Sequence, residues 1–221
     1  GSQAIEAAVR QAAVMTQLGR VDEGRGLLEQ LRRQFPPLGP RLTRAEAEML
    51  VEADLDSAAL GIYETALESA PDDDNLLYGR SLVYEKLGRF PEAEQDLRTI
   101  LERDPDNSRA LNALGYMLTV NTDRYEEARG LIESALRQEP DDAAVIDSMG
   151  WVLFKLGEPE AARGFLERAL AMADDPEISA HLGEVLWSLG ERDRARKVWD
   201  KALTRDPEHR VLRETVDRLT R

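Results

Sequence analysis

Few residues in this chain could carry out chemistry. The sequence holds two histidines, His181 and His209, and no cysteine, which excludes thiolate zinc sites, structural disulfides and cysteine nucleophiles. His181 stands one helical turn before Glu184, a spacing at which two side chains can share a metal ion. No third ligand is apparent, so we favour a histidine that lines a surface or packs between helices. The acidic run Asp72-Asp73-Asp74 lacks the alternating ligands and the glycine of a calcium loop. We therefore expect no catalytic residue, no metal and no cofactor, and a protein that is not an enzyme.

The composition favours a folded helical protein. The chain has 221 residues, of which 42% are hydrophobic, 33% charged and only 5% aromatic. Ala, Leu, Glu and Arg have high helix propensity and are abundant, which predicts an all-α fold. A net charge of −14 disfavours nucleic acid as a partner, because phosphate binding needs clustered Lys and Arg. No apolar run reaches the roughly 20 residues of a membrane-spanning helix.

A repeat of 33 to 35 residues runs through the sequence and must set its architecture. Small residues recur in phase at Ala12, Ala47, Ser81, Gly115, Gly150 and Gly183. A second small-residue series follows twelve or thirteen residues behind, at Gly24, Ala59, Ala93, Ala128, Ala162 and Ala195. Two small positions separated in this way predict two helices that approach each other closely.

Turn residues divide each repeat into a pair of helices. A glycine suited to the left-handed end of a helix lies between the two series at Gly19, Gly88, Gly157 and Gly190. The second repeat has Asp54-Leu55-Asp56 there instead, and the fourth has an extra residue in Asn121-Thr122-Asp123. Proline and acid clusters such as Glu139-Pro140-Asp141-Asp142 separate the repeats, because proline stops one helix and Asp, Asn or Ser caps the next.

The pattern resembles the tetratricopeptide repeat family over roughly residues 5–209. The best unit reads Asn112-Ala-Leu-Gly115-Tyr116, then Tyr125-Glu-Glu-Ala128, and ends at Pro140. The first two units fit least well, with Gln11 and Glu46 at positions that are commonly apolar. The resemblance implies a right-handed superhelix, an α-solenoid of six helical hairpins, whose concave face binds protein or peptide segments. We expect a lead-in with a cloning scar at 1–4, hairpins at 5–39, 40–73, 74–107, 108–142, 143–175 and 176–209, and a capping helix at 210–221.

The last segment admits two interpretations. Val211, Leu212, Val216 and Leu219 recur at helical spacing, with arginines among them. Such a helix could cap the last hairpin or begin another repeat. We favour the cap, because no Gly or Ala marks the small position.

In this family the first helix of each hairpin lines the inner face, which identifies candidate partner-binding residues. They are Tyr78, Asn112, Tyr116, Asp147, Trp151, Phe154, Lys155, His181, Glu184 and Trp187. The aromatic residues among them favour a peptide or partner-helix groove over units three to six, since binding hot spots are rich in Trp and Tyr. The alternative is that some rings simply fill gaps between hairpins, and for Trp199 we expect a core position. The groove positions of all six units carry seven acidic and six basic residues, so the net charge lies mostly elsewhere.

Two segments are more distinctive than the generic repeat. Residues 145–157 and 176–187 resemble the C-terminal repeats of proteobacterial outer-membrane lipoproteins of this family, one of which serves as adaptor for a periplasmic carboxyl-terminal processing protease. That resemblance implies a periplasmic parent anchored by a lipid at an N-terminus outside this sequence, and substrates such as cell-wall hydrolases. The alternatives are an assembly factor for a pilus or secretion complex, and a cytoplasmic scaffold.

Overall fold

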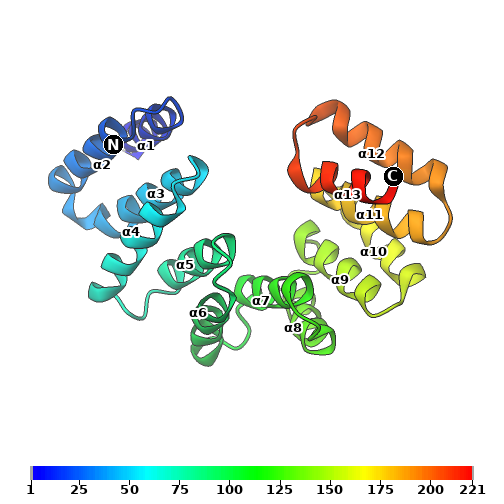
Figure 1. Ribbon diagram of the computed structural model, residues 1–221. Helices are drawn as coiled ribbons and strands as arrows, with labels where there is room; N and C mark the ends of the chain where they lie inside the picture. The colour runs from blue at the N-terminus through cyan, green and yellow to red at the C-terminus, as the bar shows by residue number, and fades with distance from the viewer. Residues whose placement is uncertain (1, 221) are drawn as a thin grey trace. The chain divides into compact units, whose positions relative to one another are not determined.

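The computed structural model describes residues 2–220 and consists of helices joined by short turns (Figure 1). Within those residues there are thirteen α-helices, one short 3-10 helix and no β-strand, which confirms the all-α prediction. The chain divides into two compact units, residues 1–103 (unit 1) and 104–221 (unit 2). Each unit has its own stack of helix pairs and is described separately.

Unit 1 contains three helical hairpins. Its helices are α1 (Ser2–Gln17), α2 (Val21–Gln34), the 3-10 helix η1 (Pro36–Leu38), α3 (Gly39–Glu52), α4 (Asp56–Ser69), α5 (Asp74–Lys86) and α6 (Phe90–Arg103). The pairs are α1 with α2, α3 with α4, and α5 with α6. Because α1 begins at Ser2, the lead-in expected at 1–4 is helical from that residue, and Gly1 lies outside the described part of the chain.

Unit 2 contains three further hairpins and a final helix. Its helices are α7 (Ser108–Asn121), α8 (Tyr125–Gln138), α9 (Ala143–Lys155), α10 (Pro159–Met172), α11 (Pro176–Ser188), α12 (Arg192–Arg205) and α13 (Arg210–Thr220). α9 packs against both helices of the preceding hairpin, and α11 does the same one hairpin later. This is the nearest-neighbour stacking of a solenoid, in which each hairpin covers the apolar side that the previous one cannot bury alone.

The predicted turn glycines adopt the conformation that their position requires. Gly19, Gly88, Gly157 and Gly190 have φ between 72° and 84°, in the left-handed region where a Cβ is unfavourable. In the second hairpin, where the glycine is missing, Asp54 takes this conformation with φ 58°. Aspartate tolerates the left-handed region better than most residues, which explains how this hairpin turns without a glycine.

The acid clusters between hairpins act as helix caps, as predicted. The side chain of Asp142 accepts hydrogen bonds from the backbone amides of Ala144 and Val145, at 2.8 and 3.1 Å. Asp73, Asn107 and Asp175 cap α5, α7 and α11 in the same way. Each cap satisfies amides that have no partner within the helix, and the three aspartates also place negative charge at the positive end of the helix dipole.

The small-residue series marks the places where paired helices touch. A Cβ added to Gly150 on α9 would lie 2.6 Å from Cγ of Leu166 on α10. On α11, a Cβ at Gly183 would overlap the indole of Trp199, which is 1% exposed and confirms its predicted core position. Ala128, Ala162 and other members of the second series are fully buried. The in-phase spacing therefore reports close helix contact inside each hairpin.

Unit 1 contains two buried carboxylates that pair with arginines. The carboxylate of Glu46 is 2% exposed and pairs with Arg25 and Arg32 of α2, each at 2.7 Å. In the third hairpin, Asp96 is buried and receives two hydrogen bonds from Arg80, at 2.7 and 2.8 Å. The poor fit of Glu46 to the family pattern thus has a physical reason, because α2 supplies the cations that a buried carboxylate needs.

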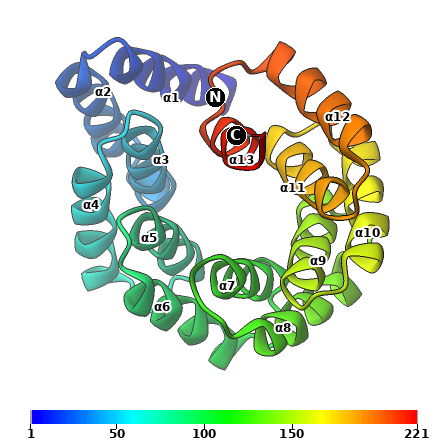
Figure 2. The same cartoon turned by 45° about the vertical axis from the view of Figure 1, so that its right-hand side comes forward.

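The last helix caps unit 2. Of the two helices before it, α13 packs mainly against the first, α11, and only lightly against the second, α12. α9 and α11 show the opposite preference, because each packs more against the second helix of the preceding hairpin than against the first. Leu212 and Thr215 are buried, while Arg210 and Arg213 on the other side of the helix are exposed. In the ribbon view, α13 lies beside α11 (Figure 2). α13 therefore does not continue the repeat geometry, which agrees with the predicted capping helix.

Candidate functional site

The ten residues predicted to line a groove lie on the first helices of hairpins. Tyr78 lies on α5 of unit 1, where it is half-buried. The other nine lie on α7, α9 and α11 of unit 2. The candidate site described below is therefore the face of unit 2 formed by these three helices.

A buried polar and aromatic cluster forms the base of this face. Asp147 of α9 and His181 of α11 are joined by hydrogen-bonding contacts of 3.0 Å between Nδ1 and both carboxylate oxygens. The imidazole also stacks on the indole of Trp151, with ring centroids 4.1 Å apart and planes 16° apart. Trp151 is 7% exposed and His181 4%. These side chains connect adjacent hairpins, and Trp151 fills the space between the hairpins rather than standing free.

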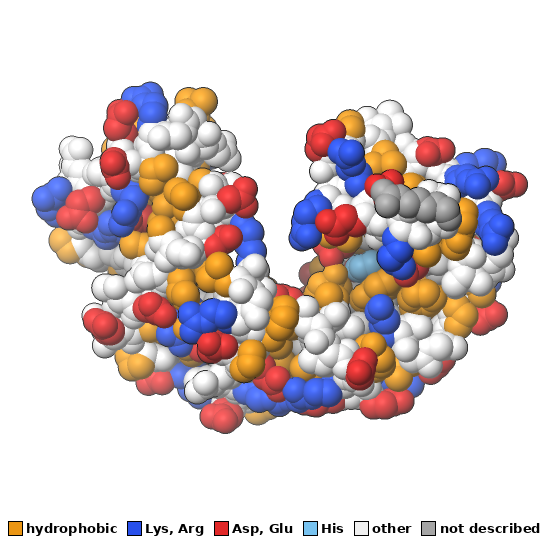
Figure 3. All heavy atoms as spheres, in the orientation of Figure 1, with side chains coloured by type: hydrophobic (Ala, Val, Ile, Leu, Met, Phe, Trp, Pro, Cys, Tyr) orange, Lys and Arg blue, Asp and Glu red, His pale blue; other side chains and the backbone are white. Residues whose placement is uncertain are grey.

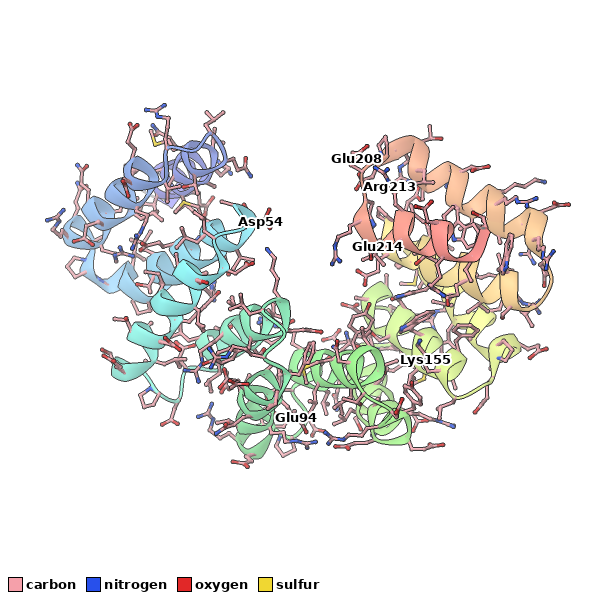
Figure 4. The ribbon with its side chains drawn as sticks, in the orientation of Figure 1. Asp54, Glu94, Lys155, Glu208, Arg213 and Glu214 are labelled. Atoms are coloured by element: carbon pink, nitrogen blue, oxygen red, sulfur yellow. The ribbon has the colours of Figure 1, made fainter. Side chains whose placement is uncertain are left out.

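Accessible side chains surround that base. Tyr116 of α7 is half-buried, and its hydroxyl is hydrogen-bonded to Glu177 of α11. Phe154 is half-buried against Trp151, with a centroid separation of 5.4 Å. Lys155, at the end of α9, is exposed and places its ammonium 4.8 Å from the centre of the Trp151 ring (Figure 4). In the space-filling view, hydrophobic side chains gather over α9 with charged ones around them (Figure 3).

Two other predicted residues have different surroundings. The side-chain oxygen of Asn112 is buried without a hydrogen-bond partner among the described residues. Glu184 is mostly buried and forms an ion pair with Arg218 of the capping helix, at 2.6 Å. Because His181 engages Asp147 while Glu184 engages Arg218, these two side chains have separate partners. Within residues 2–220, no group of three or more His, Asp or Glu residues could hold a metal ion.

Trp187 stands apart from the other aromatic residues. Its ring contacts Trp199 of α12, with centroids 5.6 Å apart, and lies beneath the guanidinium groups of Arg192 and Arg196. Its contacts are therefore with its own hairpin, whereas Tyr116 and Trp151 both approach His181, at centroid distances of 6.2 and 4.1 Å. The structure brings Tyr116, Trp151, Phe154 and His181 together and leaves Trp187 in a second aromatic group.

Some residues of this face were not among the sequence candidates. Val120, one turn after Tyr116 on α7, is 48% exposed and adds aliphatic surface. Glu177 and Arg218 were missed as partners of Tyr116 and Glu184. The repeat register could have identified Val120, since it corresponds to Lys155 one unit earlier. Glu177 is 61 residues from Tyr116 in the sequence, and Arg218 is 34 residues from Glu184. No local sequence pattern indicates contacts over such separations.

Comparison with known proteins places the chain in a family. A model described as tetratricopeptide repeat matches residues 17–74 and 78–143, and a second model with the same description matches 121–179 and 153–214. The chain belongs to the tetratricopeptide repeat family. Its helical hairpins accordingly form a scaffold for protein–protein interaction.

Two relatives illustrate the range of similar sequences. The TPR repeat-containing protein PA4667 of Pseudomonas aeruginosa is 42% identical over 181 residues, which cover 82% of this chain and 31% of that protein. The BBSome complex member BBS4 of Bos taurus is 36% identical over 74 residues, covering 34% of this chain and 14% of that protein. The chain thus spans less than a third of the length of either relative.

Solved structures agree with the fold. TTC0263, a thermophilic TPR protein of Thermus thermophilus, superposes with a TM-score of 0.72 at 29% identity, over 82% of this chain and 98% of that one. MamA of Desulfovibrio magneticus RS-1 gives a TM-score of 0.60 at 17% identity, over 77% and 96%. The second likeness shows the fold alone. Among the described residues no helix is long and apolar enough to cross a membrane.

Proposed function

We propose that this chain is the C-terminal part of a lipoprotein adaptor that presents substrates, such as cell-wall hydrolases, to a periplasmic carboxyl-terminal processing protease. Membership of a scaffold family supports a protein-binding role. The finer assignment is supported by the resemblance of residues 145–157 and 176–187 to adaptor lipoproteins of this kind. In this proposal the parent protein is anchored to the outer membrane, and the repeats extend into the periplasm.

The observation that carries the proposal is the face of unit 2 formed by α7, α9 and α11. Tyr116, Val120, Phe154 and Lys155 remain accessible above a base that is already packed and hydrogen-bonded. A partner therefore meets aromatic and aliphatic surface whose geometry is fixed before binding. Preorganisation of this kind lowers the entropy cost of association, and aromatic anchors supply most of the energy at protein interfaces.

The chemistry of this face selects a particular kind of segment. Phe154, Val120 and the ring of Tyr116 suit an apolar side chain of the substrate. The ammonium of Lys155 has no ion-pair partner among the described residues, so it can receive a carboxylate, either from an acidic side chain or from a chain end. We therefore expect this face to bind a mainly apolar segment that carries a negative charge.

A binding experiment with two variants tests the proposal. The chain would be immobilised and its affinity for the purified protease and for a purified cell-wall hydrolase measured, with a degradation assay of the hydrolase in parallel. Phe154→Ala and Lys155→Glu should each weaken capture about tenfold or more, because they remove an aromatic anchor and reverse the accessible charge. Arg137→Glu, an exposed residue of α8 outside this face, makes the same charge change and serves as control.

The results separate the possible outcomes. If the Phe154 and Lys155 variants bind like wild type while circular dichroism shows them folded, this face is not the docking site. If neither protease nor hydrolase binds the wild-type chain, the adaptor assignment is wrong, although the scaffold family membership stands. Specific binding of a secretion-channel or pilus subunit instead would favour an assembly factor.

A further inference from the structure

A second feature of unit 2 lies around the turn between α11 and α12. Half-buried Trp187 lies at the end of α11 and faces the two exposed arginines Arg192 and Arg196 of α12. The guanidinium carbons lie 5.1 and 5.5 Å from the centre of the indole ring. Both distances are within the range of cation–π attraction. The ring therefore holds two positive groups side by side at the surface.

These two cations lack the acidic partners that most arginines of the described chain have. Within residues 2–220, most arginines pair with a carboxylate, and neighbouring Arg194 is bound to both Glu191 and Glu167. Arg192 and Arg196 form no such ion pair in the described structure, although the chain is strongly acidic. Asp193 and Asp200 are near in sequence, yet neither pairs with them.

Their position on α12 makes the missing partners costly. Arg192 and Arg196 are four residues apart on the helix, so their like charges face each other. Arg192 is also the first residue of α12, where the helix dipole disfavours a cation. Cation–π contact with Trp187 offsets part of this cost, but a carboxylate would offset far more. The repulsion between the two arginines is therefore reduced further when an anion binds to them.

We propose that Trp187, Arg192 and Arg196 form a docking patch for an acidic segment of a partner protein. The guanidinium groups receive carboxylates through charge-assisted hydrogen bonds, and the indole keeps both groups in place. The patch is distinct from the face around Phe154 and Lys155, and the inference does not rest on the adaptor function proposed above. It would give the scaffold a second contact with its partner, or a contact with a second partner.

The two arginines and the acidic surface around them favour a short acidic protein segment over a long polyanion as the ligand. A nucleic acid would extend beyond two arginines, and the net charge of −14 together with exposed Asp193 and Asp200 would repel its further phosphates. A polypeptide can place two carboxylates on the patch and leave the rest of its surface neutral. The guanidinium groups of Arg192 and Arg196, held over the same indole ring, can each bind one of those two carboxylates.

Fluorescence anisotropy with a defined probe tests this inference. The probe is a short fluorescein-labelled peptide of alternating Glu and Ser, and its counterpart has Gln in place of Glu. Wild-type chain should bind the Glu peptide at low salt, bind the Gln peptide far more weakly, and release the Glu peptide as salt rises. The double variant Arg192→Glu/Arg196→Glu should weaken binding about tenfold or more, and Trp187→Leu about threefold.

A matched control distinguishes the patch from overall charge. Arg10→Glu/Arg137→Glu changes the net charge by the same amount at exposed residues of α1 and α8, where neither arginine pairs with a carboxylate within residues 2–220. The inference predicts that this variant binds the Glu peptide nearly as well as wild type. Equal weakening in the two double variants would overturn it. Competition by single-stranded DNA as strong as that by the unlabelled peptide would overturn the assignment to an acidic protein segment.

Discussion

Replacing Gly150 by alanine should destabilise unit 2, although alanine is the better helix former. The new Cβ would lie 2.6 Å from Cγ and 2.9 Å from Cδ2 of Leu166, and 3.2 Å from the backbone oxygen of Ala162. Carbon atoms pack best at about 3.5–4.0 Å, so α9 and α10 must separate by roughly 1 Å or Leu166 must leave its rotamer. Leu166 is fully buried, so its side chain cannot turn into solvent to make room.

The expected size of the effect follows from two opposing terms. Overpacking of a core costs about 1–3 kcal/mol, and the higher helix propensity of alanine returns about 1 kcal/mol. With the overlap near the upper end of that range, we expect a net loss of about 2 kcal/mol. For a chain of this size that corresponds to a fall in melting temperature of about 4–8 °C. Thermal and urea unfolding followed by far-UV circular dichroism would measure it.

The same hairpin offers a control for this substitution. Gly164 lies inside α10, and a Cβ added there meets no atom within 4 Å. Gly164→Ala should therefore raise the stability by about 0.5–1 kcal/mol through helix propensity alone. Shortening the opposing side chain, as in Gly150→Ala/Leu166→Val, should recover part of the loss in a double-mutant cycle. If Gly150→Ala is as stable as Gly164→Ala, the close approach of the two helices does not explain the glycine.

Three further outcomes follow from the structure. Glu46→Gln should lower the unfolding free energy by about 2 kcal/mol, measured in urea, because Arg25 and Arg32 lose a buried carboxylate; an unchanged midpoint would show that this pair adds nothing. Burial raises the pKa of Tyr63 to about 12, helped by nearby Glu48 and opposed by Arg44. The neutral phenol is therefore favoured in the folded state, so its contribution is complete below pH 10 and is lost as pH rises toward 12, and Tyr63→Phe should show a smaller fall in melting temperature over that interval. Asp142→Ala should cost about 1 kcal/mol by thermal melting, because α9 loses its N-cap. Glu139→Ala provides the control, because it removes an exposed carboxylate of the same cluster that caps no helix within the described chain.

The hairpins could be predicted because their signals are local. Gly157, with φ 84°, lies two residues after the end of α9 and turns the chain. Asp142 caps the start of the same helix by binding the amides of Ala144 and Val145. Such signals depend on a few consecutive residues, and each recurs once per repeat. Small residues at Gly150 and Ala162 report contact within one hairpin, only twelve residues apart. Because the turn, cap and small-residue signals recur once per repeat, each repeat confirms the assignment made in the others.

The helices that carry the candidate residues were predictable, but the burial of the individual side chains was not. The family pattern placed Trp151, Phe154 and Trp187 on the same kind of helix face. Whether a ring on that face is buried depends on the side chain that the next hairpin presents. His181, thirty residues after Trp151, covers its indole, while Phe154 remains partly accessible. The register alone gives no indication of this difference.

The sequence by itself determined that this protein is a series of helical hairpins, where each one turns, and which residues let its helices touch. Those properties follow from backbone conformation and from residues within about one hairpin of each other. Only the tertiary structure decided that Asp147 and His181 form a buried pair, that Glu46 is neutralised by α2, and that Trp187 lies beneath two arginines without acidic partners among the described residues. Each of these depends on which side chains from different helices meet and on how much water remains around a charge.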